Sequence, residues 1–302
     1  MPLKVIDASV NNFMLNPVSA LISFCNQSLS PDHSLCVFDL QNGHSKWVDL
    51  SPIPDSFRHV FSGVTGICTV GEDVIITTQG ESPVLAIVSI KEAKIANYLP
   101  LEKSKDTHSL VFQDGYVYVV STGTNEIYKI HYQDGQFGKE ELFWRYPDVS
   151  YDKDEVHLNG LTIDGDCFIA SCFGSKKNDG SWGKDGRVFY VNSGYTILGG
   201  LHQPHSPAII ERRLVFAESA ENKVYVFNKI EHERWLVNSE IALGGYARGI
   251  AFSDSCLWVG ISAERKLSRS QKIFSKANQK SIYSRYVELN IETGERRKWS
   301  LI

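Results

Sequence analysis

Short apolar runs separated by turn residues recur along the chain, and five of them open in a similar way. The openings read Thr65-Gly66-Ile67, His108-Ser109-Leu110, Asn159-Gly160-Leu161, His205-Ser206-Pro207 and Arg248-Gly249-Ile250. Successive openings lie 43 to 51 residues apart. A period of about 40 to 50 residues built from short strands is typical of the blades of a β-propeller.

Each repeat contains the signals for four antiparallel strands. A turn such as Asp164-Gly165-Asp166 follows the opening run and leads into a second strand-forming run, as in residues 116–120. A third run is clear at residues 126–131, 223–228 and 285–290, and turn residues then lead to a fourth. This alternation predicts blades of four antiparallel strands.

The N-terminal segment predicts one further blade, with strands over residues 20–25, 34–40 and 45–50. Its innermost strand comes either from residues 3–10 or from a blade that the two termini share. No amphipathic helical period of useful length and no linker interrupts the pattern. We therefore predict an all-β, six-bladed β-propeller with four antiparallel strands per blade, formed as a single domain over residues 1–302, with five or seven blades as alternatives.

Composition narrows the class of protein. The chain has 302 residues, of which 42% are hydrophobic and 22% charged, so it has enough apolar material for a large core. A net charge of -4 argues against a general nucleic-acid binder. The start MPLKVIDASVNNFML does not resemble a signal peptide, and no run of about 18 apolar residues predicts a membrane span. The six cysteines form no CxxC pair, which favours reduced thiols in a cytoplasmic protein over a zinc–thiolate site.

In a propeller the first strand of each blade lines the central axis, so the repeated openings predict a ring of side chains around one pocket. His157 stands two residues before Asn159, and on a strand this spacing returns it to the same side. The predicted ring therefore consists of Thr65, His108, His157, Asn159, His205 and Arg248.

Two long loops are expected to share the mouth of this pocket, because the loop that joins strands two and three lies on the same face as the ring. Residues 174–186 carry Trp182, and residues 264–280 carry six basic side chains against Glu264. A basic flap would attract anionic ligands, and a solvated loop is the alternative. The six are Arg265, Lys266, Arg269, Lys272, Lys276 and Lys280.

The ring chemistry has three interpretations. In the first, His108, His157 and His205 hold one divalent transition metal such as Zn, Fe or Mn, which neutral imidazoles suit. Against it, Arg248 would repel a metal unless an anion lay between them, and no carboxylate stands at an aligned opening. In the second, structural interpretation, the polar side chains satisfy backbone groups of the loops.

In the third interpretation the pocket performs acid–base catalysis without a metal. Arg248 would hold a carboxylate or phosphate, and His108, His157 or His205 would transfer a proton. Glu218 would orient His205. The remaining candidates would bind substrate: Asn159 and Thr65 through hydrogen bonds, Trp182 and Tyr246 as aromatic walls, and Arg265 from the basic loop.

Several motifs resemble an uncharacterised family of conserved hypothetical propeller-like proteins. They are His157-Leu158-Asn159-Gly160-Leu161, the 180–186 stretch with Trp182, Pro204-His205-Ser206-Pro207, Ala247-Arg248-Gly249-Ile250-Ala251-Phe252 and Val259-Gly260-Ile261-Ser262. The resemblance runs from about His108 to the C-terminus and implies a propeller without a settled activity.

More distantly, the chain is similar to gluconolactonase/regucalcin-like and NHL-repeat propellers. The former hold an axial divalent metal through acidic and amide ligands; Asn159 matches such an amide, but no acid is aligned with it. Streptogramin lyases are similar in outline, and His205 with Glu218 is the nearest match to their histidine and carboxylate.

These observations predict a cytoplasmic enzyme that acts on a small anionic or polar metabolite by lyase, isomerase or hydrolase chemistry, with no nucleic-acid or membrane partner. The alternative is a non-catalytic propeller that binds a protein partner or senses a ligand.

Overall fold

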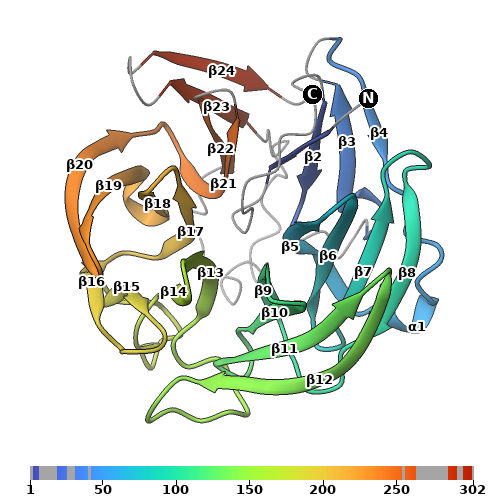
Figure 1. Cartoon of the computed structure of the whole chain (residues 1–302), viewed down its shortest axis with the longest axis horizontal. Coiled ribbons are helices and arrows are strands. Elements are labelled where there is room, and N and C mark those ends of the chain that lie inside the picture. The colour runs from blue at the N-terminus through green and yellow to red at the C-terminus, as the bar shows by residue number, and fades with distance from the viewer. Residues whose placement is uncertain are drawn as a thin grey trace.

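A computed structural model describes residues 3–6, 19–25, 31–39, 42–253, 256–262, 285–290 and 295–300. Within these residues, twenty-four strands form six four-stranded sheets arranged around a common centre (Figure 1). The predicted six-bladed propeller is confirmed. No helix in the described ranges is long and apolar enough to span a membrane.

The sheets follow one another in chain order, and from the second blade onward each runs from the centre outward. The first blade contains β1 (Leu3–Ile6), β2 (Ser19–Ser23), β3 (Leu35–Asp39) and β4 (Ser45–Trp47). The short helix α1 (Asp55–Arg58) follows it. The second blade contains β5 (Phe61–Val70), β6 (Asp73–Gly80), β7 (Val84–Ser89) and β8 (Lys94–Pro100). The third contains β9 (Thr107–Gln113), β10 (Tyr116–Ser121), β11 (Glu126–Gln133) and β12 (Gln136–Arg145), and the fourth β13 (Leu158–Asp164), β14 (Cys167–Cys172), β15 (Gly186–Tyr190) and β16 (Thr196–Leu201). The fifth contains β17 (Pro204–Ile210), β18 (Arg213–Glu218), β19 (Lys223–Glu231) and β20 (Arg234–Ala242), and the sixth β21 (Tyr246–Ser253), β22 (Cys256–Ser262), β23 (Arg285–Asn290) and β24 (Arg296–Ser300).

Both faces of the blades are buried, which explains why the second strands read as continuous apolar runs. In β6, Val74 and Ile76 pack toward the first blade, while Ile75 between them packs toward the third. The period-two geometry of a strand thus supplies two cores at once.

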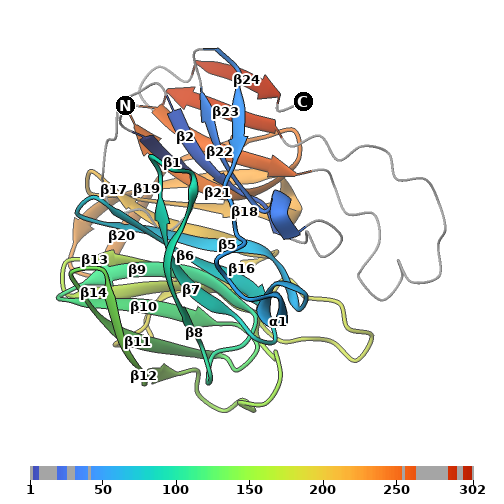
Figure 2. The ribbon, with the colours of Figure 1, turned by 90° about the vertical axis from the view of Figure 1, so that its right-hand side faces the viewer.

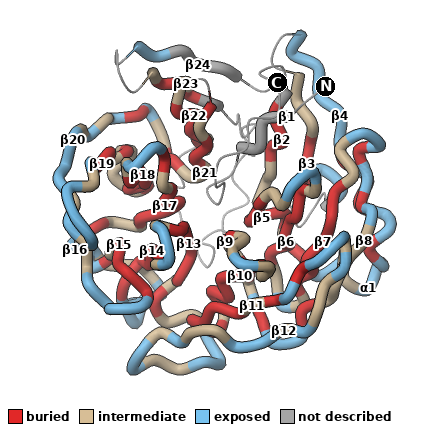
Figure 3. The backbone as a smooth tube through the Cα atoms, viewed as in Figure 1, coloured by how far each residue is buried: buried red, intermediate tan, exposed pale blue. Residues whose placement is uncertain are grey.

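One hydrophobic cluster fills each of the six interfaces between neighbouring blades in the described structure. The interface between the sixth and first blades contains Ala251 and Trp258 packed with Ala20, Ile22 and Cys36, and it closes the ring. Burial is therefore concentrated in the inner strands, and the outer strands are largely exposed (Figure 3). Figure 2 shows the ring from the side, with the second blade toward the viewer.

The first blade differs from the others in its innermost strand. β1 supplies this strand from residues 3–6, in agreement with the first of the two expected alternatives, but it pairs with β2 in parallel. The remaining strand pairs of the six blades are antiparallel. The last strands of the chain, β23 and β24, complete the sixth blade and do not enter the first.

The loop that enters a blade and the loop that joins its second and third strands meet at the same face, as propeller topology requires. In the third blade, the backbone N–H of Lys105 donates to Ser121 Oγ at 2.9 Å. In the fifth, the N–H of Ser219 donates to the carbonyl of Gln203 at 3.1 Å. Side chains from these two loops can therefore act together at each blade opening.

Candidate functional site

A β-bulge interrupts the pairing of the first two strands in five blades, at or beside the aligned opening residue. The register skips Thr65, His108 and Asn159 themselves. His205 directly precedes the skipped residues of its blade, and Arg248 is one of the two skipped in the sixth. A bulge bends its strand and re-aims the side chain there, so the recurrence of the bulge explains how these positions come to share one environment.

A second backbone feature recurs two residues before four of these positions. Gly63, Asp106, His157 and Gln203 all have positive φ, between +46° and +123°. Glycine adopts this conformation freely, whereas histidine and glutamine do so rarely, and such strain is often found at functional sites. We call these four residues the corner residues. His157 is therefore a corner residue, and the expectation that it lies on a strand beside Asn159 is wrong, since β13 begins at Leu158.

His108 is held by its Nδ1 atom. This atom lies 2.8 Å from the carbonyl oxygen of Asp106 and 2.9 Å from Thr122 Oγ1. Thr122 also donates its hydroxyl proton to the carbonyl of Leu158, in the next blade. Burial lowers the pKa of His108 to about 4; Asp106 acts in the opposite sense, while His157 and Arg248 lower it further. The ring is therefore neutral at neutral pH.

His205 repeats this arrangement two blades away. Its Nδ1 atom lies 3.1 Å from the carbonyl of Gln203 and 2.7 Å from Ser219 Oγ, and Ser219 donates to the carbonyl of Ala247 in the next blade. Burial, followed by the charge of Arg248, holds the pKa of His205 well below its ordinary value of 6.5.

The Nε2 atom of His205 is buried and has no hydrogen-bond partner among the described residues. The whole residue is only 6% exposed. Leaving a buried polar atom unsatisfied costs about 1–3 kcal/mol. Such an atom is often found where a ligand or an ordered water would bind.

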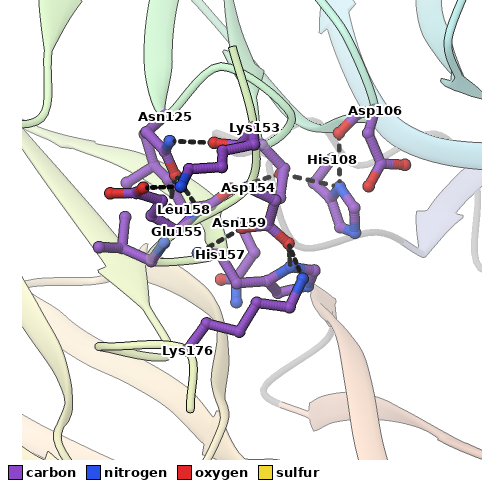
Figure 4. A network of polar contacts seen from close by, with 12 residues as sticks. Asp106, His108, Asn125, Lys153, Asp154, Glu155, His157, Leu158, Asn159 and Lys176 are labelled. Atoms are coloured by element: carbon purple, nitrogen blue, oxygen red, sulfur yellow. Dashed lines mark hydrogen bonds and ion pairs between the residues drawn. The ribbon is translucent and has the colours of Figure 1, made fainter. Parts of the chain in front are cut away.

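His157 has a different partner. Its Nδ1 atom lies 2.9 Å from Asp154 Oδ2, and its backbone N–H donates to Asp154 Oδ1 at 2.8 Å (Figure 4). The two side chains are 15% and 19% exposed. Burial tends to raise the pKa of Asp154, but its hydrogen bonds with His157 and the charge of Lys176 lower it overall. The carboxylate is therefore ionised and orients the imidazole.

The predicted residues lie in a continuous series of aromatic contacts. The ring centroids of His108 and His157 are 5.0 Å apart, and His157 lies 4.2 Å from Phe173. Phe173 lies 4.8 Å from His205, which lies 5.8 Å from Tyr246. We call the group formed by these five residues and Arg248 the axial cluster. Trp182 packs against this cluster, 5.3 Å from His157 and 5.5 Å from Phe173.

Arg248 supplies the positive charge of the axial cluster. Its guanidinium lies 5.4 Å from the centroid of the Tyr246 ring, and Nη1 lies 2.7 Å from Cys25 Sγ. No carboxylate in the described ranges lies within ion-pair distance of it. Burial disfavours the charged form, but Cys25 and Tyr246 raise the pKa of Arg248, so the guanidinium stays protonated.

Asn159 and Thr65 join neighbouring blades. Asn159 Nδ2 donates to the carbonyl of Pro204 at 3.0 Å, and its Oδ1 accepts the hydroxyl proton of Ser171. Thr65 Oγ1 donates to the carbonyl of Thr107 at 2.6 Å. Each acceptor carbonyl belongs to the residue just before the next aligned position. These contacts fit the structural interpretation for Asn159 and Thr65, and the expected substrate contacts of the two residues stay a prediction.

Glu218 does not pair with His205, so that expectation is wrong. Its carboxylate accepts the backbone N–H of His202 at 2.7 Å and the hydroxyl proton of Tyr225 at 3.0 Å. β18 ends at Glu218, and it is the next residue, Ser219 at the start of a short 3-10 turn, that reaches the imidazole. Glu218 therefore stabilises the loop, whereas Ser219 contacts the cluster.

The three imidazoles do not form a metal-binding group. No set of three His, Cys, Asp or Glu side chains among the described residues is placed to hold a metal ion. Phe173 packs against both His157 and His205. Arg265 and the other basic residues of the 264–280 loop lie outside the described residues.

Four residues of the site were not predicted. Asp154 stands three residues before His157 in a polar stretch that resembles a solvated loop, and the Asp-x-x-His spacing is the signal that could have revealed it. Thr122 and Ser219 both directly follow a second strand, so aligning those positions could have found them. Phe173 gave no signal, because an apolar residue after a strand is ordinary core.

A family model for a domain of unknown function (DUF4915) matches residues 54–300. The chain belongs to this family. The match begins about fifty residues earlier than the motifs of the sequence indicated and includes every blade from the second onward. Comparison of the sequence with curated proteins gives no match.

The fold is shared with solved propellers of low sequence identity. A structure of the nidogen/laminin complex aligns with a TM-score of 0.57 at 9% identity, covering 92% of each chain. A putative 6-phosphogluconolactonase from Bacteroides uniformis gives 0.55 at 13%, covering 93% of this chain and 81% of that one. The PQQ-bound aldose sugar dehydrogenase from Streptomyces coelicolor gives 0.55 at 14%, covering 95% and 94%. These likenesses establish the propeller fold alone.

Proposed function

We propose that this chain is an enzyme that binds a small anionic metabolite at the axial cluster and transfers a proton to or from it. The observation that carries the proposal is Arg248, a partly buried cation that pairs with no carboxylate of the described residues and lies over Tyr246, which in turn packs against His205. A cation removed from water without a counter-ion is unfavourable. A ligand carboxylate or phosphate would supply that counter-ion through charge-assisted hydrogen bonds.

His157 is the residue proposed to transfer the proton. The ionised Asp154 accepts a hydrogen bond from Nδ1 and would stabilise the imidazolium that forms when Nε2 takes up a proton. His108 and His205 are held neutral by burial and so serve as hydrogen-bonding groups. This division of roles suits a lyase, isomerase or hydrolase.

Binding calorimetry with a panel of small carboxylates and phosphates tests the anion site. We expect binding that weakens as salt rises and falls at least tenfold in Arg248→Met. Arg187→Met is the matched control, since that guanidinium also lies over a tyrosine ring, 5.2 Å from Tyr146, but outside the axial cluster. Equal binding by wild type and Arg248→Met would show that the axial cluster is not the ligand site.

The proton-transfer role is tested separately, in the ligands that bind. For a lyase or isomerase, wild-type protein in D₂O should exchange a carbon-bound ligand proton for deuterium, measured by NMR. Asp154→Asn and His157→Gln should slow this exchange, or the turnover of an identified reaction, at least tenfold while ligand affinity changes less. Unchanged rates in both variants would exclude the assigned role of His157.

A second candidate function, protein binding, is favoured by one surface. On the outer edge of the fifth blade, Leu236 and Val237 are 60% and 49% exposed, and nearby Ile230 is 50% exposed. β20 is the last strand of its sheet, and an apolar edge strand is a site where another chain can add. Leu236→Glu should weaken such a partner's binding and leave anion binding unchanged.

We also propose that the protein acts in the cytoplasm without a nucleic-acid partner. All six cysteines lie in described residues and none forms a disulfide, which supports a reducing compartment. The net charge of -4 supports the absence of a nucleic-acid partner. Fractionation of cells that express the full chain tests the location.

A further inference from the structure

The hydroxyl group beside His205 determines which nitrogen of that imidazole carries the proton. Ser219 Oγ has one proton, and it goes to the carbonyl of Ala247, which can only accept. Toward His205 Nδ1, at 2.7 Å, the same oxygen must therefore accept. The carbonyl of Gln203 on the same nitrogen is also only an acceptor. Both contacts require that Nδ1 carries the hydrogen.

The same reasoning applies to His108. Thr122 donates its single hydroxyl proton to the carbonyl of Leu158, so it accepts from His108 Nδ1 at 2.9 Å. The carbonyl of Asp106, at 2.8 Å, is a second acceptor on that nitrogen. Two imidazoles from separate blades therefore have the same fixed tautomer.

A neutral imidazole that carries its hydrogen on Nδ1 has a lone pair on Nε2. Both rings are neutral, because burial and the nearby Arg248 oppose protonation. The buried Nε2 of His205 is thus an acceptor to which no residue of the described ranges donates, and the same holds for Nε2 of His108. A ligand that fits this cluster must bring hydrogen-bond donors.

Arg248 sets the second requirement, because it offers N–H donors and a positive charge without a carboxylate partner in the described part of the chain. A fully ionised phosphate or polycarboxylate has acceptors only, so its oxygens would face the imidazole lone pairs. An ammonium group would donate but would be repelled by the guanidinium. A hydroxyl group can donate to the imidazole lone pairs, and because it is neutral the guanidinium does not repel it.

We propose that the ligand is a hydroxylated carboxylate, such as a hydroxy acid or sugar acid. Its carboxylate lies on Arg248 and its hydroxyl groups donate to Nε2 of His205 and His108. Ser219 and Thr122 are positioning residues, since they act by fixing the tautomer of these rings. This inference rests on the proposed function, because it defines the ligand of the same site.

Calorimetry with matched pairs of acids tests the proposal on the full chain: glycolate against acetate, lactate against propionate, and D-gluconate against hexanoate. We expect at least one hydroxylated acid to bind tenfold or more tightly than its partner, with the preference reduced several-fold in Ser219→Ala or Thr122→Val. If the acids bind through Arg248 but no pair favours the hydroxylated member, this inference is overturned while the proposed anion site stands. If Arg248→Met changes nothing, the proposed function itself fails.

A spectroscopic measurement tests the tautomers without any ligand. In ¹⁵N-histidine-labelled protein, two-bond ¹H–¹⁵N correlations should show His108 and His205 protonated at Nδ1 and unprotonated at Nε2. Ser219→Ala should shift the His205 resonances toward the other tautomer. Thr162→Val is the control for fold effects, because Thr162 Oγ1 also joins two blades, by accepting the N–H of Ile209, but contacts no imidazole. Nε2-protonated rings in the wild type would contradict the proposal.

Discussion

The corners that open the fourth and fifth blades share a backbone conformation but hold different kinds of imidazole. At the first, the corner residue is His157 itself, with φ of +49°, and a carboxylate binds its Nδ1. At the second, the corner residue is Gln203, with φ of +59°, and the histidine follows two residues later with only neutral oxygens on its Nδ1. The third blade repeats the second pattern with Asp106 and His108.

This difference shows how one repeated turn can supply two chemistries. The hydrogen bond from His205 to the carbonyl of Gln203 favours a protonated ring, but burial and the charge of Arg248 outweigh it, so the imidazole stays neutral. His157 instead pairs with the carboxylate of Asp154, and this pairing is the reason we propose it as the acid–base group. A two-residue shift in position therefore separates an imidazole paired with a carboxylate from one held by neutral oxygens.

The largest effect on stability is expected from a substitution that pushes apart the inner strands of the fourth and fifth blades, which carry the two corners. Gly160 of β13 lies against β17, and a Cβ added there would lie 2.3 Å from Pro207 Cδ and 2.4 Å from Ser171 Oγ. Gly160→Ala should destabilise the fold by about 3 kcal/mol or more, as expected for overpacking and lost contacts in a close-packed seam. Chemical denaturation measures this.

Gly244→Ala is the control for Gly160→Ala, because a Cβ at Gly244 meets no atom within 4 Å. It should change stability by less than about 1 kcal/mol. Similar losses in the two variants would contradict the close approach of the inner strands.

The neutral state of His108 is tested by the pH dependence of stability. Its pKa is about 4 in the folded protein and near 6.5 when unfolded, so the unfolded chain binds more protons between these values. Stability is therefore fully present above pH 6.5 and falls as pH drops toward 4, by about 3 kcal/mol at about 1.4 kcal/mol per pKa unit.

The variant His108→Gln should flatten this part of the pH–stability curve. His44→Gln, at an exposed position outside the axial cluster, should leave the curve unchanged. Urea denaturation at several pH values provides the comparison. If the stability of His108→Gln falls as steeply with pH as that of the wild type, His108 is not held neutral in the folded protein between pH 4 and pH 6.5.

The contact between Asp154 and the corner residue His157 is tested by Asp154→Asn, which keeps the shape of the side chain and removes its charge. Hydrogen bonds to charged groups contribute about 1.5–3 kcal/mol each, but the pair is partly exposed, so we expect a loss of about 1–2 kcal/mol at pH 7. Thermal denaturation measures this loss.

Asp152→Asn is the matched control, since Asp152 lies two residues away, is exposed and bonds only its neighbour Ser150 among the contacts of the described residues. It should have little effect. If Asp154→Asn is as harmless as Asp152→Asn, the carboxylate does not hold His157, and the distinction between the two corners is lost.

The blade pattern was predictable because it depends on local rules. Turn residues at regular spacing end each strand, and both-sided burial demands continuous apolar runs such as those of β10 and β18. The positions of His108, His205 and Arg248 follow from the same repeat. The parallel pairing of β1 could not be derived this way, since no turn residue of the repeat fixes its direction.

The partners of the imidazoles were harder to predict because single residues decide them. Glu218 and Ser219 are adjacent, and only the exact end of β18 and the 3-10 turn that follows it determine that the hydroxyl rather than the carboxylate reaches His205. Asp154 is one acid among several in residues 152–155, and only the left-handed corner at His157 brings it onto Nδ1. Composition does not carry either distinction.

The central claim is that one ligand binds to the imidazoles of the third, fourth and fifth blades and to the guanidinium of Arg248 in the sixth blade. Titration of ¹⁵N-histidine-labelled protein with D-gluconate, or with the tightest acid of the calorimetry panel, tests it most directly. The account predicts that the Nε2 resonances of His108, His157 and His205 shift together with one binding curve, and that the shifts disappear in Arg248→Met. Shifts confined to outer histidines such as His44 and His131, or unchanged by Arg248→Met, would contradict it.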